Sequence, residues 1–124
     1  MLHIVHLEDE TPLSEILQAT IELADPDAQI KHFINSDDAM QYIEEYGQAV
    51  DLFVLDIRVP GKLDGLEIAY EIRALGCPGE IVITSAYQFP SFDVLNELQA
   101  EWIPKPWHVK ELSTRLVEIA NRQQ

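Results

Sequence analysis

The chain has 124 residues, and 22 Asp and Glu against 8 Lys and Arg give a formal net charge of −14 with His counted as neutral. This length suits one domain, and the 47% of hydrophobic residues is enough to build a buried core. The acidic excess argues against a nucleic-acid-binding face, which needs basic residues, and against docking on an anionic membrane.

Cysteine content and the N-terminal sequence indicate the cellular compartment. The single Cys cannot form an internal disulfide. The start MLHIVHLEDE lacks the basic residues and long apolar run of a signal peptide. Because no apolar run approaches the roughly 20 residues of a membrane span, we expect one soluble cytoplasmic domain over residues 1–124.

Short apolar runs alternate with segments in which apolar residues recur at helical spacing. Most of the apolar runs are rich in Val and Ile, which favour strands. Thr11 suits the N-cap of the first helix with Pro12 directly after it, and Gly47 suits the end of the second. In chain order the predicted elements are a strand over Leu2–Leu7, a helix over Thr11–Ala24, a strand over Ala28–Ile34, a helix from Ser36 to Gly47, a strand over Val50–Leu55, a helix over Asp64–Leu75, a strand over Glu80–Thr84, a helix over Ser91–Gln99, a short strand over Glu101–Ile103 and a helix over Trp107–Asn121.

The repeated alternation of strand and helix predicts an α/β domain with a parallel sheet, right-handed crossovers and helices on both faces. The nearly continuous apolar strands agree, because a parallel sheet is covered on both sides. Pro104 cannot donate a ladder hydrogen bond and therefore favours an edge position for the last strand. Ligands of such sheets bind at the carboxyl ends of the strands, so the residues after each strand form the candidate site.

Charged and hydroxyl side chains follow four of the predicted strands. The acidic run Glu8–Glu10 follows the first strand, Asp56 the third, Ser85 the fourth and Lys105 the fifth. Carboxylates that converge at one rim repel one another unless one is protonated or a cation lies between them. Oxygen ligands at a partly hydrated rim suit a hard cation, so we expect Mg²⁺ rather than zinc.

The same residues predict chemistry on a phosphoryl group. A divalent cation and the Lys105 ammonium would let a phosphoryl dianion approach an acidic pocket, and the Ser85 hydroxyl can donate a hydrogen bond to one of its oxygens. A carboxylate in this setting can act as a nucleophile and form an acyl phosphate. Asp56 is the best candidate, because it directly follows an apolar strand that would hold it in place.

Four sequence blocks in this order resemble the receiver domain of bacterial two-component response regulators: IVHLEDE, VLDIRVPGKLDG, IVITSA and WIPKPW. The resemblance runs from Leu2 to about Ala120, and the order and spacing of the blocks are more specific than any single block. It implies a flavodoxin-like, CheY-like (βα)5 sandwich of three layers with strand order 2-1-3-4-5. It also implies a receiver domain over residues 1–124 without an output domain.

The resemblance implies a role for each acidic residue at the rim. Glu8, Asp9 and Asp56 would hold Mg²⁺ together with the backbone carbonyl of Arg58. Asp56 would be the phosphoacceptor, and the donor would be a sensor histidine kinase or a histidine phosphotransfer protein. The output is then switched binding, so the chain is not expected to be an enzyme in its own right.

The remaining implied roles concern switching. Lys105, with an expected cis bond to Pro106, and Ser85 would contact the acyl phosphate, and Ser85 and Trp102 would be the switch residues. A downstream protein would bind the surface of the fourth helix, fifth strand and fifth helix, and a homodimer is a second way to use that surface. The region around the fourth helix is apolar enough for such an interface, with Phe89, Phe92, Val94, Leu95 and Leu98.

Three departures from the family pattern affect these expectations. The loop over residues 60–65, PGKLDG, is one residue longer than usual, which is expected to shift access to the site or the start of the third helix. Trp102 is larger than the usual Tyr or Phe, which is expected to hinder an inward swing of the ring. Arg58 and Tyr87 occupy positions that flank the path of the hydrolytic water, so we expect an altered phosphate lifetime.

Two other functions stay open. A pseudo-receiver would bind partners without accepting phosphate. Trp102 and Pro104 are unusual for the receiver family and are the residues that favour this alternative. An aspartyl-phosphate phosphatase of the haloacid dehalogenase type would need a second Asp two residues after Asp56, where this chain has Arg58. A flavin-binding protein of the same topology is disfavoured, because the first loop, LEDETP, is acidic.

The four histidines are interpreted as structural or surface groups. His3 and His6 lie an odd number of residues apart on a predicted strand, so their side chains face opposite sides of the sheet. His32 and His108 have no partner at metal-binding spacing. The sequence therefore predicts no histidine ligand for the metal.

Overall fold

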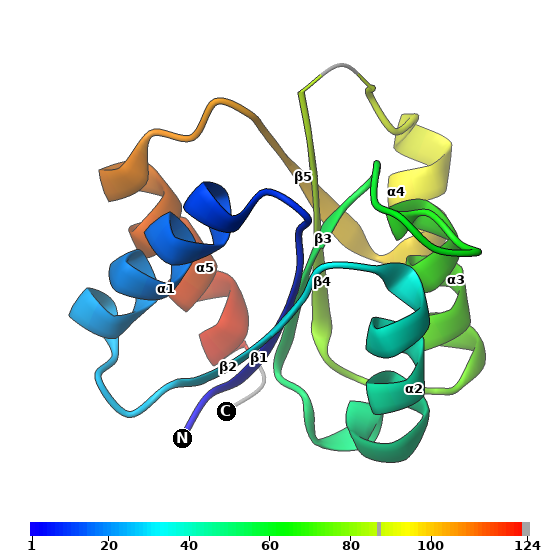
Figure 1. The fold of residues 1–124 in the computed structure, drawn as a ribbon, viewed down its shortest axis with the longest axis horizontal. Coiled ribbons are helices and arrows are strands. Elements are labelled where there is room, and N and C mark those ends of the chain that lie inside the picture. The colour runs from blue at the N-terminus through cyan, green and yellow to red at the C-terminus, as the bar shows by residue number, and fades with distance from the viewer. Residues whose placement is uncertain (87, 123–124) are drawn as a thin grey trace.

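The structure is a computed structural model that describes residues 1–86 and 88–122 (Figure 1). Strands and helices alternate along the chain in the predicted order. The elements are β1 (His3–Leu7), α1 (Thr11–Ala24), β2 (Gln29–Phe33), α2 (Ser36–Tyr46), the 3-10 turn η1 (Gly47–Ala49), β3 (Leu52–Asp56), α3 (Gly65–Ala74), β4 (Glu80–Ser85), α4 (Phe92–Leu98), β5 (Ala100–Pro104) and α5 (Val109–Asn121).

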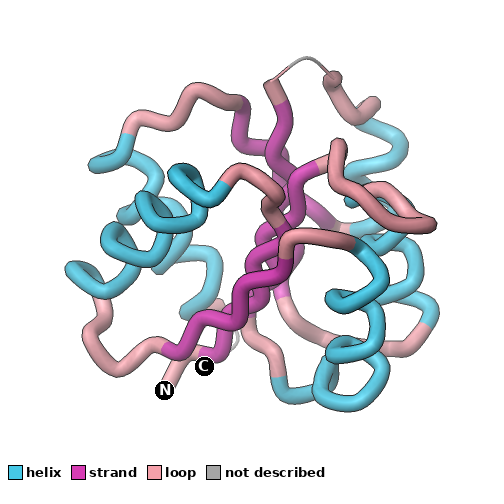
Figure 2. The backbone as a smooth tube through the Cα atoms, in the orientation of Figure 1, coloured by secondary structure: helices cyan, strands magenta, loops and turns pink. Residues whose placement is uncertain are grey.

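The strands form one parallel sheet in the order β2-β1-β3-β4-β5. Helices α1 and α5 cover one face, and α2, α3 and α4 cover the other, so the sheet lies between two helical layers (Figures 1 and 2). This confirms the predicted flavodoxin-like α/β fold. The edge position of β5 also agrees with the prediction from Pro104.

Two buried clusters form the core, one on each face of the sheet. Neighbouring residues of β3 alternate between them: Phe53 and Leu55 pack toward α2 and α3, whereas Leu52 and Val54 pack toward α1 and α5. Every residue of β3 is buried. The strand that ends in Asp56 is therefore held from both sides, which fixes the position of this carboxylate.

Polar groups define where the helices begin. The Asp64 side chain accepts a hydrogen bond from the backbone of Glu67, and the Glu67 side chain accepts one from the backbone of Asp64, which caps α3. The prediction that Thr11 is the N-cap of α1 is wrong. Glu10 is the N-cap, because its amide is held by the Glu8 carboxylate and its carbonyl already accepts the first helical bonds.

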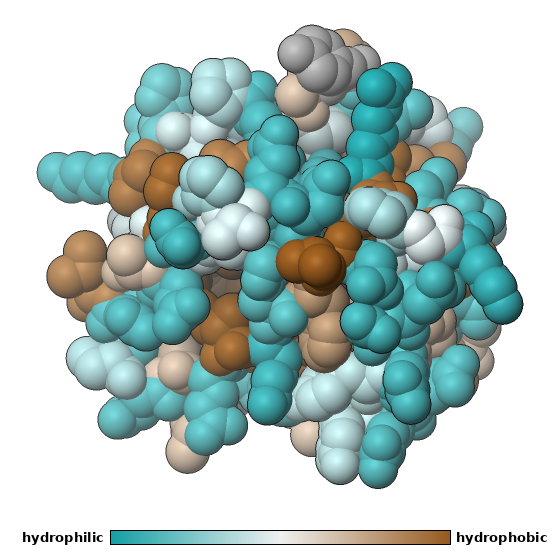
Figure 3. Space-filling model, viewed as in Figure 1, coloured by the Kyte–Doolittle hydropathy of each residue, from teal (hydrophilic) through white to brown (hydrophobic). Residues whose placement is uncertain are grey.

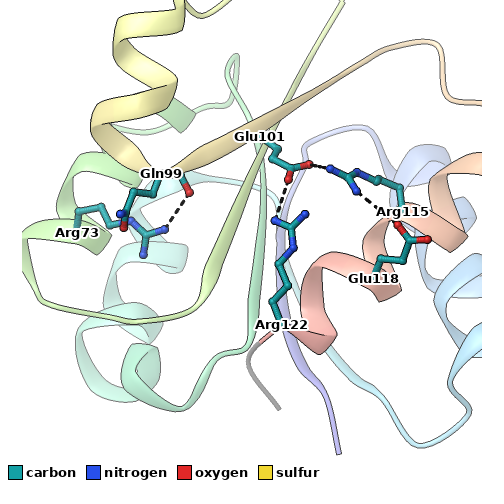
Figure 4. Close-up of polar contacts among 6 residues, drawn as sticks. All are labelled: Arg73, Gln99, Glu101, Arg115, Glu118 and Arg122. Carbon is teal, nitrogen blue, oxygen red and sulfur yellow. Dashed lines mark hydrogen bonds and ion pairs between the residues drawn. The ribbon is translucent and has the colours of Figure 1, made fainter.

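One partly buried cation, Arg73, joins α3 to the end of α4. The guanidinium of Arg73 donates hydrogen bonds to four backbone carbonyls, and Figure 4 shows the contact with Gln99. These acceptors lie in the α3–β4 turn and at the C-terminal end of α4, where the last carbonyls of a helix have no partner within it. They are the carbonyls of Cys77 at 3.0 Å, Gly79 at 2.9 Å, Leu98 at 2.7 Å and Gln99 at 3.4 Å.

The edge strand β5 is joined to α5 by exposed ion pairs. The Glu101 carboxylate lies 2.6 Å from Arg115 and 2.9 Å from Arg122, and Arg115 also pairs with Glu118 (Figure 4). The face seen in Figure 3 is mostly hydrophilic with separate apolar patches. Among the described residues, no helix is both long and apolar enough to cross a membrane.

Candidate functional site

The residues predicted from the strand ends lie together at one edge of the sheet. They surround a pocket of about 220 Å³ at the carboxyl ends of β1, β3, β4 and β5, where the strand order predicts ligand binding. Its lining residues are Asp9, Glu10, Asp56, Arg58, Ser85, Ala86, Gln88 and Lys105. Tyr87, which we expected beside the path of the hydrolytic water, lies outside the described residues.

Three carboxylates converge at this edge. Glu8, Asp9 and Asp56 each offer one oxygen, and these oxygens lie within 4.8 Å of one another. Glu8 is fully buried and Asp56 is 6% exposed, whereas Asp9 is open to solvent. The arrangement places two fixed carboxylates at the base and one at the rim.

Lys105 supplies the cation that balances part of this charge. Its Nζ lies 2.7 Å from Oε1 of Glu8 and 3.2 Å from Oδ2 of Asp56. The bond between Lys105 and Pro106 is cis, as expected, and the Lys105 amide donates to the Ser85 carbonyl at 3.0 Å. The end of β5 is thus fastened to the end of β4, and the ammonium is directed at the carboxylates.

Burial and charge shift the acid–base behaviour of this pair. Burial raises the pKa of Glu8 to about 7; the hydrogen bond from Lys105 opposes this rise, and the charge of Asp56 adds to it. Burial alone would lower the pKa of Lys105, but contacts with Glu8 and Asp56 outweigh it, and the pKa is raised. Lys105 is therefore charged at neutral pH, whereas Glu8 is on the edge of ionisation.

A pH-dependent stability difference follows from the pKa of Glu8. Without divalent cations, we expect Glu8→Gln to become more stable relative to wild type as pH rises from about 5 to about 8. In the folded protein Glu8 keeps its proton up to a pKa of about 7, against an ordinary value of 4.5. Wild type therefore loses stability across this window, by at most about 3 kcal/mol.

Urea unfolding in EDTA at several pH values measures this difference. Other titrating groups, including the buried His6, are present in both proteins and largely cancel in the comparison. A difference between the two proteins that stays constant from pH 5 to pH 8 would show that Glu8 does not carry the raised pKa.

The donor set fits a hard divalent cation. Three carboxylates face one ammonium, so full ionisation leaves two uncompensated negative charges in a small volume. All the candidate ligands are oxygens, which suits Mg²⁺, and the rim position of Asp9 leaves room for coordinated water. Glu8, Asp9 and Asp56 could therefore hold Mg²⁺ in the way the sequence predicts.

Ser85 and Trp102 are in direct contact. The indole N–H of Trp102 donates to the Ser85 hydroxyl at 3.0 Å, and this hydroxyl donates to the carbonyl of Gln88. The expectation that the size of Trp102 hinders an inward swing of the ring stays a prediction. The ring is partly buried against the core, and the exposed Phe89 packs edge-on against it with centroids 4.9 Å apart.

The loop over residues 60–65 after β3 does not line the pocket. It packs against the start of α2. There the Pro60 carbonyl accepts a hydrogen bond from the Ser36 amide, and the Leu63 amide donates one to the Ser36 hydroxyl at 3.1 Å. Gly61, at φ +117°, approaches Ser36 too closely for any side chain. The loop is thus packed beside α2, and α3 begins at Gly65.

Sequence reasoning missed the contact of His32 with the site. His32 is in register with His6 on the neighbouring strand, and its Nε2 lies 2.7 Å from the carbonyl oxygen of Glu8. As predicted, His3 and His6 face opposite sides: His3 contacts Tyr42 of α2, and His6 packs near Trp107. The only signal for the His32 contact was its place in the strand next to β1.

The comparisons with known proteins identify the family. Residues 4–117 match the response regulator receiver domain. The chain belongs to this receiver family. It is therefore a receiver domain of two-component signalling, a kind of module that is generally non-catalytic and partners with histidine kinases. The carboxylates of Glu8, Asp9 and Asp56 form the acidic triad typical of a receiver Mg²⁺ site.

Two curated relatives contain a similar segment. The transcriptional regulatory protein AruR of Pseudomonas aeruginosa is 32% identical over 94% of this chain and 48% of its own length. The cyclic di-GMP phosphodiesterase response regulator RpfG of Xanthomonas campestris is 30% identical over 99% of this chain and 33% of its own length. This chain thus spans half or less of these relatives.

Solved structures share the fold. A LuxR-family DNA-binding response regulator from Staphylococcus aureus is 27% identical, with a TM-score of 0.77, over 98% of this chain and 100% of its own. A CheY-like receiver domain from Methanospirillum hungatei has a TM-score of 0.82 at 16% identity, covering 99% of this chain and 96% of its own. The receiver fold is therefore kept at very low sequence identity.

Proposed function

We propose that this receiver domain accepts a phosphoryl group on Asp56 in a Mg²⁺-dependent reaction and thereby changes its binding to a partner protein. The observation that carries the proposal is the convergence of the carboxylates of Glu8, Asp9 and Asp56 with the Lys105 ammonium around one pocket. The donor is the phosphohistidine of a sensor histidine kinase or of a phosphotransfer protein.

Each residue has a distinct task in the transfer. Glu8, Asp9, Asp56 and the backbone carbonyl of Arg58 would hold Mg²⁺, which would supply positive charge to the oxygens of the transferring group. A carboxylate oxygen of Asp56 forms a new bond to phosphorus while the bond from phosphorus to the donor imidazole nitrogen breaks. The electron pair of that bond stays on the imidazole, and the product on this chain is an acyl phosphate.

Lys105 and Ser85 respond to the new group. The Lys105 ammonium moves part of its interaction from the carboxylates to the phosphoryl oxygens. The Ser85 hydroxyl gives up its bond to the Gln88 carbonyl and donates to a phosphoryl oxygen instead. Because Trp102 donates to the same hydroxyl at 3.0 Å, the indole follows this movement. Ser85 and Trp102 are thus the switch residues of the proposal.

The partner surface comprises α4, β5 and α5. Phe89, in the β4–α4 loop beside it, packs on Trp102, so a change at the pocket reaches the outside through adjacent side chains. Phe92 at the start of α4 is 86% exposed, which supplies apolar contact area. A downstream protein or a second copy of this chain would bind there.

The geometry favours a phosphoacceptor over a phosphatase. The residue two positions after Asp56 is the exposed Arg58, which cannot serve as the acid or base that a phosphatase of the haloacid dehalogenase type needs. The pocket of about 220 Å³ is also small for a phosphate ester with a bulky organic group.

Incubation with acetyl phosphate and Mg²⁺, followed by intact-mass measurement, tests the proposal. Wild type is expected to gain one phosphoryl group, and Asp56→Ala is expected to gain none. Asp51→Ala is the matched control, because Asp51 precedes β3 at the other end, where it accepts a hydrogen bond from the His3 amide. This variant is expected to be phosphorylated like wild type.

The other outcomes separate the alternatives. Wild type that binds Mg²⁺ but gains no mass would mark the chain as a pseudo-receiver. Sustained release of phosphate from esters over many turnovers would indicate a phosphatase. Phosphorylation that persists in Asp56→Ala would place the acceptor elsewhere.

A further inference from the structure

The side chain of His32 makes a hydrogen bond to the backbone carbonyl of Glu8. Nε2 of His32 lies 2.7 Å from the carbonyl oxygen of Glu8. A carbonyl oxygen can only accept a hydrogen bond, so Nε2 must carry the hydrogen in this contact. The hydrogen bond to Glu8 therefore fixes the orientation of the His32 imidazole and requires hydrogen on Nε2.

This contact takes the place of a missing ladder bond. The Glu8 amide donates to the Phe33 carbonyl at 2.9 Å, which extends the pairing of β1 with β2 by one residue. β2 ends at Phe33, and the chain turns toward the cap of α2 at Asn35. The His32 ring supplies a donor to the Glu8 carbonyl at the point where the strand ends.

The other polar groups of Glu8 are held by the site itself. Oε1 lies 2.7 Å from Nζ of Lys105, and Oε2 accepts from the Glu10 amide at 3.2 Å. His32 is the one side chain outside the acidic pocket that, within the described part of the chain, makes a polar contact with Glu8. It can therefore be changed without removing a carboxylate or the ammonium.

A stack of rings keeps His32 in place. His6 packs between His32 and Trp107, with ring centroids 5.6 Å and 6.1 Å away. Nζ of Lys105 lies 5.9 Å from the centroid of the Trp107 ring. Both partners of the Glu8–Lys105 pair are thus supported by the same row of rings.

We propose that His32 is a positioning residue for metal binding: its hydrogen bond to the Glu8 carbonyl fixes the chain turn that presents Glu8 and Asp9 to Mg²⁺. The inference rests on the proposed function, because it assumes that these carboxylates bind the ion. Groups that orient metal ligands from behind change metal affinity when they are removed, typically by about 10–100-fold.

Titration calorimetry with Mg²⁺ tests the role of the donor. We expect His32→Phe, which keeps a ring but loses the N–H, to raise the Mg²⁺ Kd at least about tenfold. His32→Gln is expected to recover most of the affinity, because its amide nitrogen lies about as far along the side chain as Nε2. At saturating Mg²⁺, phosphorylation of His32→Phe by acetyl phosphate is expected to return to the wild-type rate.

His3→Phe is the matched control. His3 lies at the start of β1, in register with Gln29 of β2. Its ring makes a 2.6 Å hydrogen bond to Tyr42, on the face of the sheet opposite His6. Its loss is expected to leave the Mg²⁺ Kd unchanged. A His32→Phe protein with the wild-type Kd would overturn the inference alone, as would failure of His32→Gln to recover affinity. Wild type that does not bind Mg²⁺ would overturn the proposed function as well.

A measurement on wild type does not depend on the folding of any variant. The ¹⁵N chemical shifts of the His32 ring distinguish the two neutral tautomers. We expect the tautomer with hydrogen on Nε2, both before and after Mg²⁺ is added. The opposite tautomer would show that His32 does not donate to Glu8 and would overturn the inference.

Discussion

Replacing Lys105 by Met is expected to destabilise the metal-free protein by about 2–4 kcal/mol at pH 8. The Lys105 side chain is only 11% exposed, and its ammonium is shared between the buried carboxylates of Glu8 and Asp56. Removal of one partner leaves the others as uncompensated buried charge, which is far more costly than the loss of an exposed ion pair.

The size of this effect depends on pH and on metal. Below the pKa of Glu8, about 7, that carboxyl is protonated and repels Asp56 less. The destabilisation by Lys105→Met is therefore expected to shrink toward pH 5.5. Saturating Mg²⁺ is expected to restore part of the lost stability at pH 8, because it supplies the charge that the ammonium no longer provides.

Urea unfolding at pH 5.5 and pH 8, with EDTA or with Mg²⁺, measures these effects. Lys110→Met is the matched control, since Lys110 is exposed on α5. It is expected to change the free energy of unfolding by less than about 0.5 kcal/mol. If Lys105→Met is as stable as this control at pH 8 in EDTA, the ammonium does not lie between the carboxylates.

A methyl group at Gly65 is expected to destabilise the fold by about 2–3 kcal/mol and to weaken Mg²⁺ binding. Gly65 is the first residue of α3, and a Cβ there would lie 2.1 Å from the carbonyl oxygen of Asp56 and 3.0 Å from Cα of Ile57. Both contacts are with backbone, which cannot rotate away. Relief of the clash requires α3 or the segment carrying Asp56 to move.

Gly76→Ala separates this clash from the general cost of losing a glycine. Gly76 has φ +74°, and nothing lies within 4 Å of its added Cβ. Its substitution is expected to cost about 1 kcal/mol through backbone strain, with no change in Mg²⁺ affinity. Urea unfolding and Mg²⁺ titration of both variants check this. Equal effects of Gly65→Ala and Gly76→Ala would contradict direct packing of α3 on the Asp56 backbone.

Features that depend on local pattern were predictable from the sequence. The apolar runs and helical spacings located every strand and helix to within a few residues, because burial on one or both faces imposes the period of the pattern. The positions of Asp56, Ser85 and Lys105 followed from the same logic, since the carboxyl ends of parallel strands meet at one edge.

Features that depend on side-chain direction across the fold were not predictable. The contact of His32 with the Glu8 carbonyl requires the register of β1 with β2, and register is set by the packed sheet. The hydrogen bond of Trp102 to Ser85 depends on how an indole fits between β4, β5 and the loop after β4. The size of Trp102, which is all that the sequence gives, carries no information about this contact.

The carbonyls held by Arg73 set limits on how α4 can rearrange. Its guanidinium fastens the last turn of the helix, at Leu98 and Gln99, to the α3–β4 turn, and Leu98 is the buried residue of α4. The first turn, at Phe92, is largely exposed. The C-terminal end of α4 is therefore held more firmly than its first turn, so a tilt of the helix would displace Phe92 farther than Leu98.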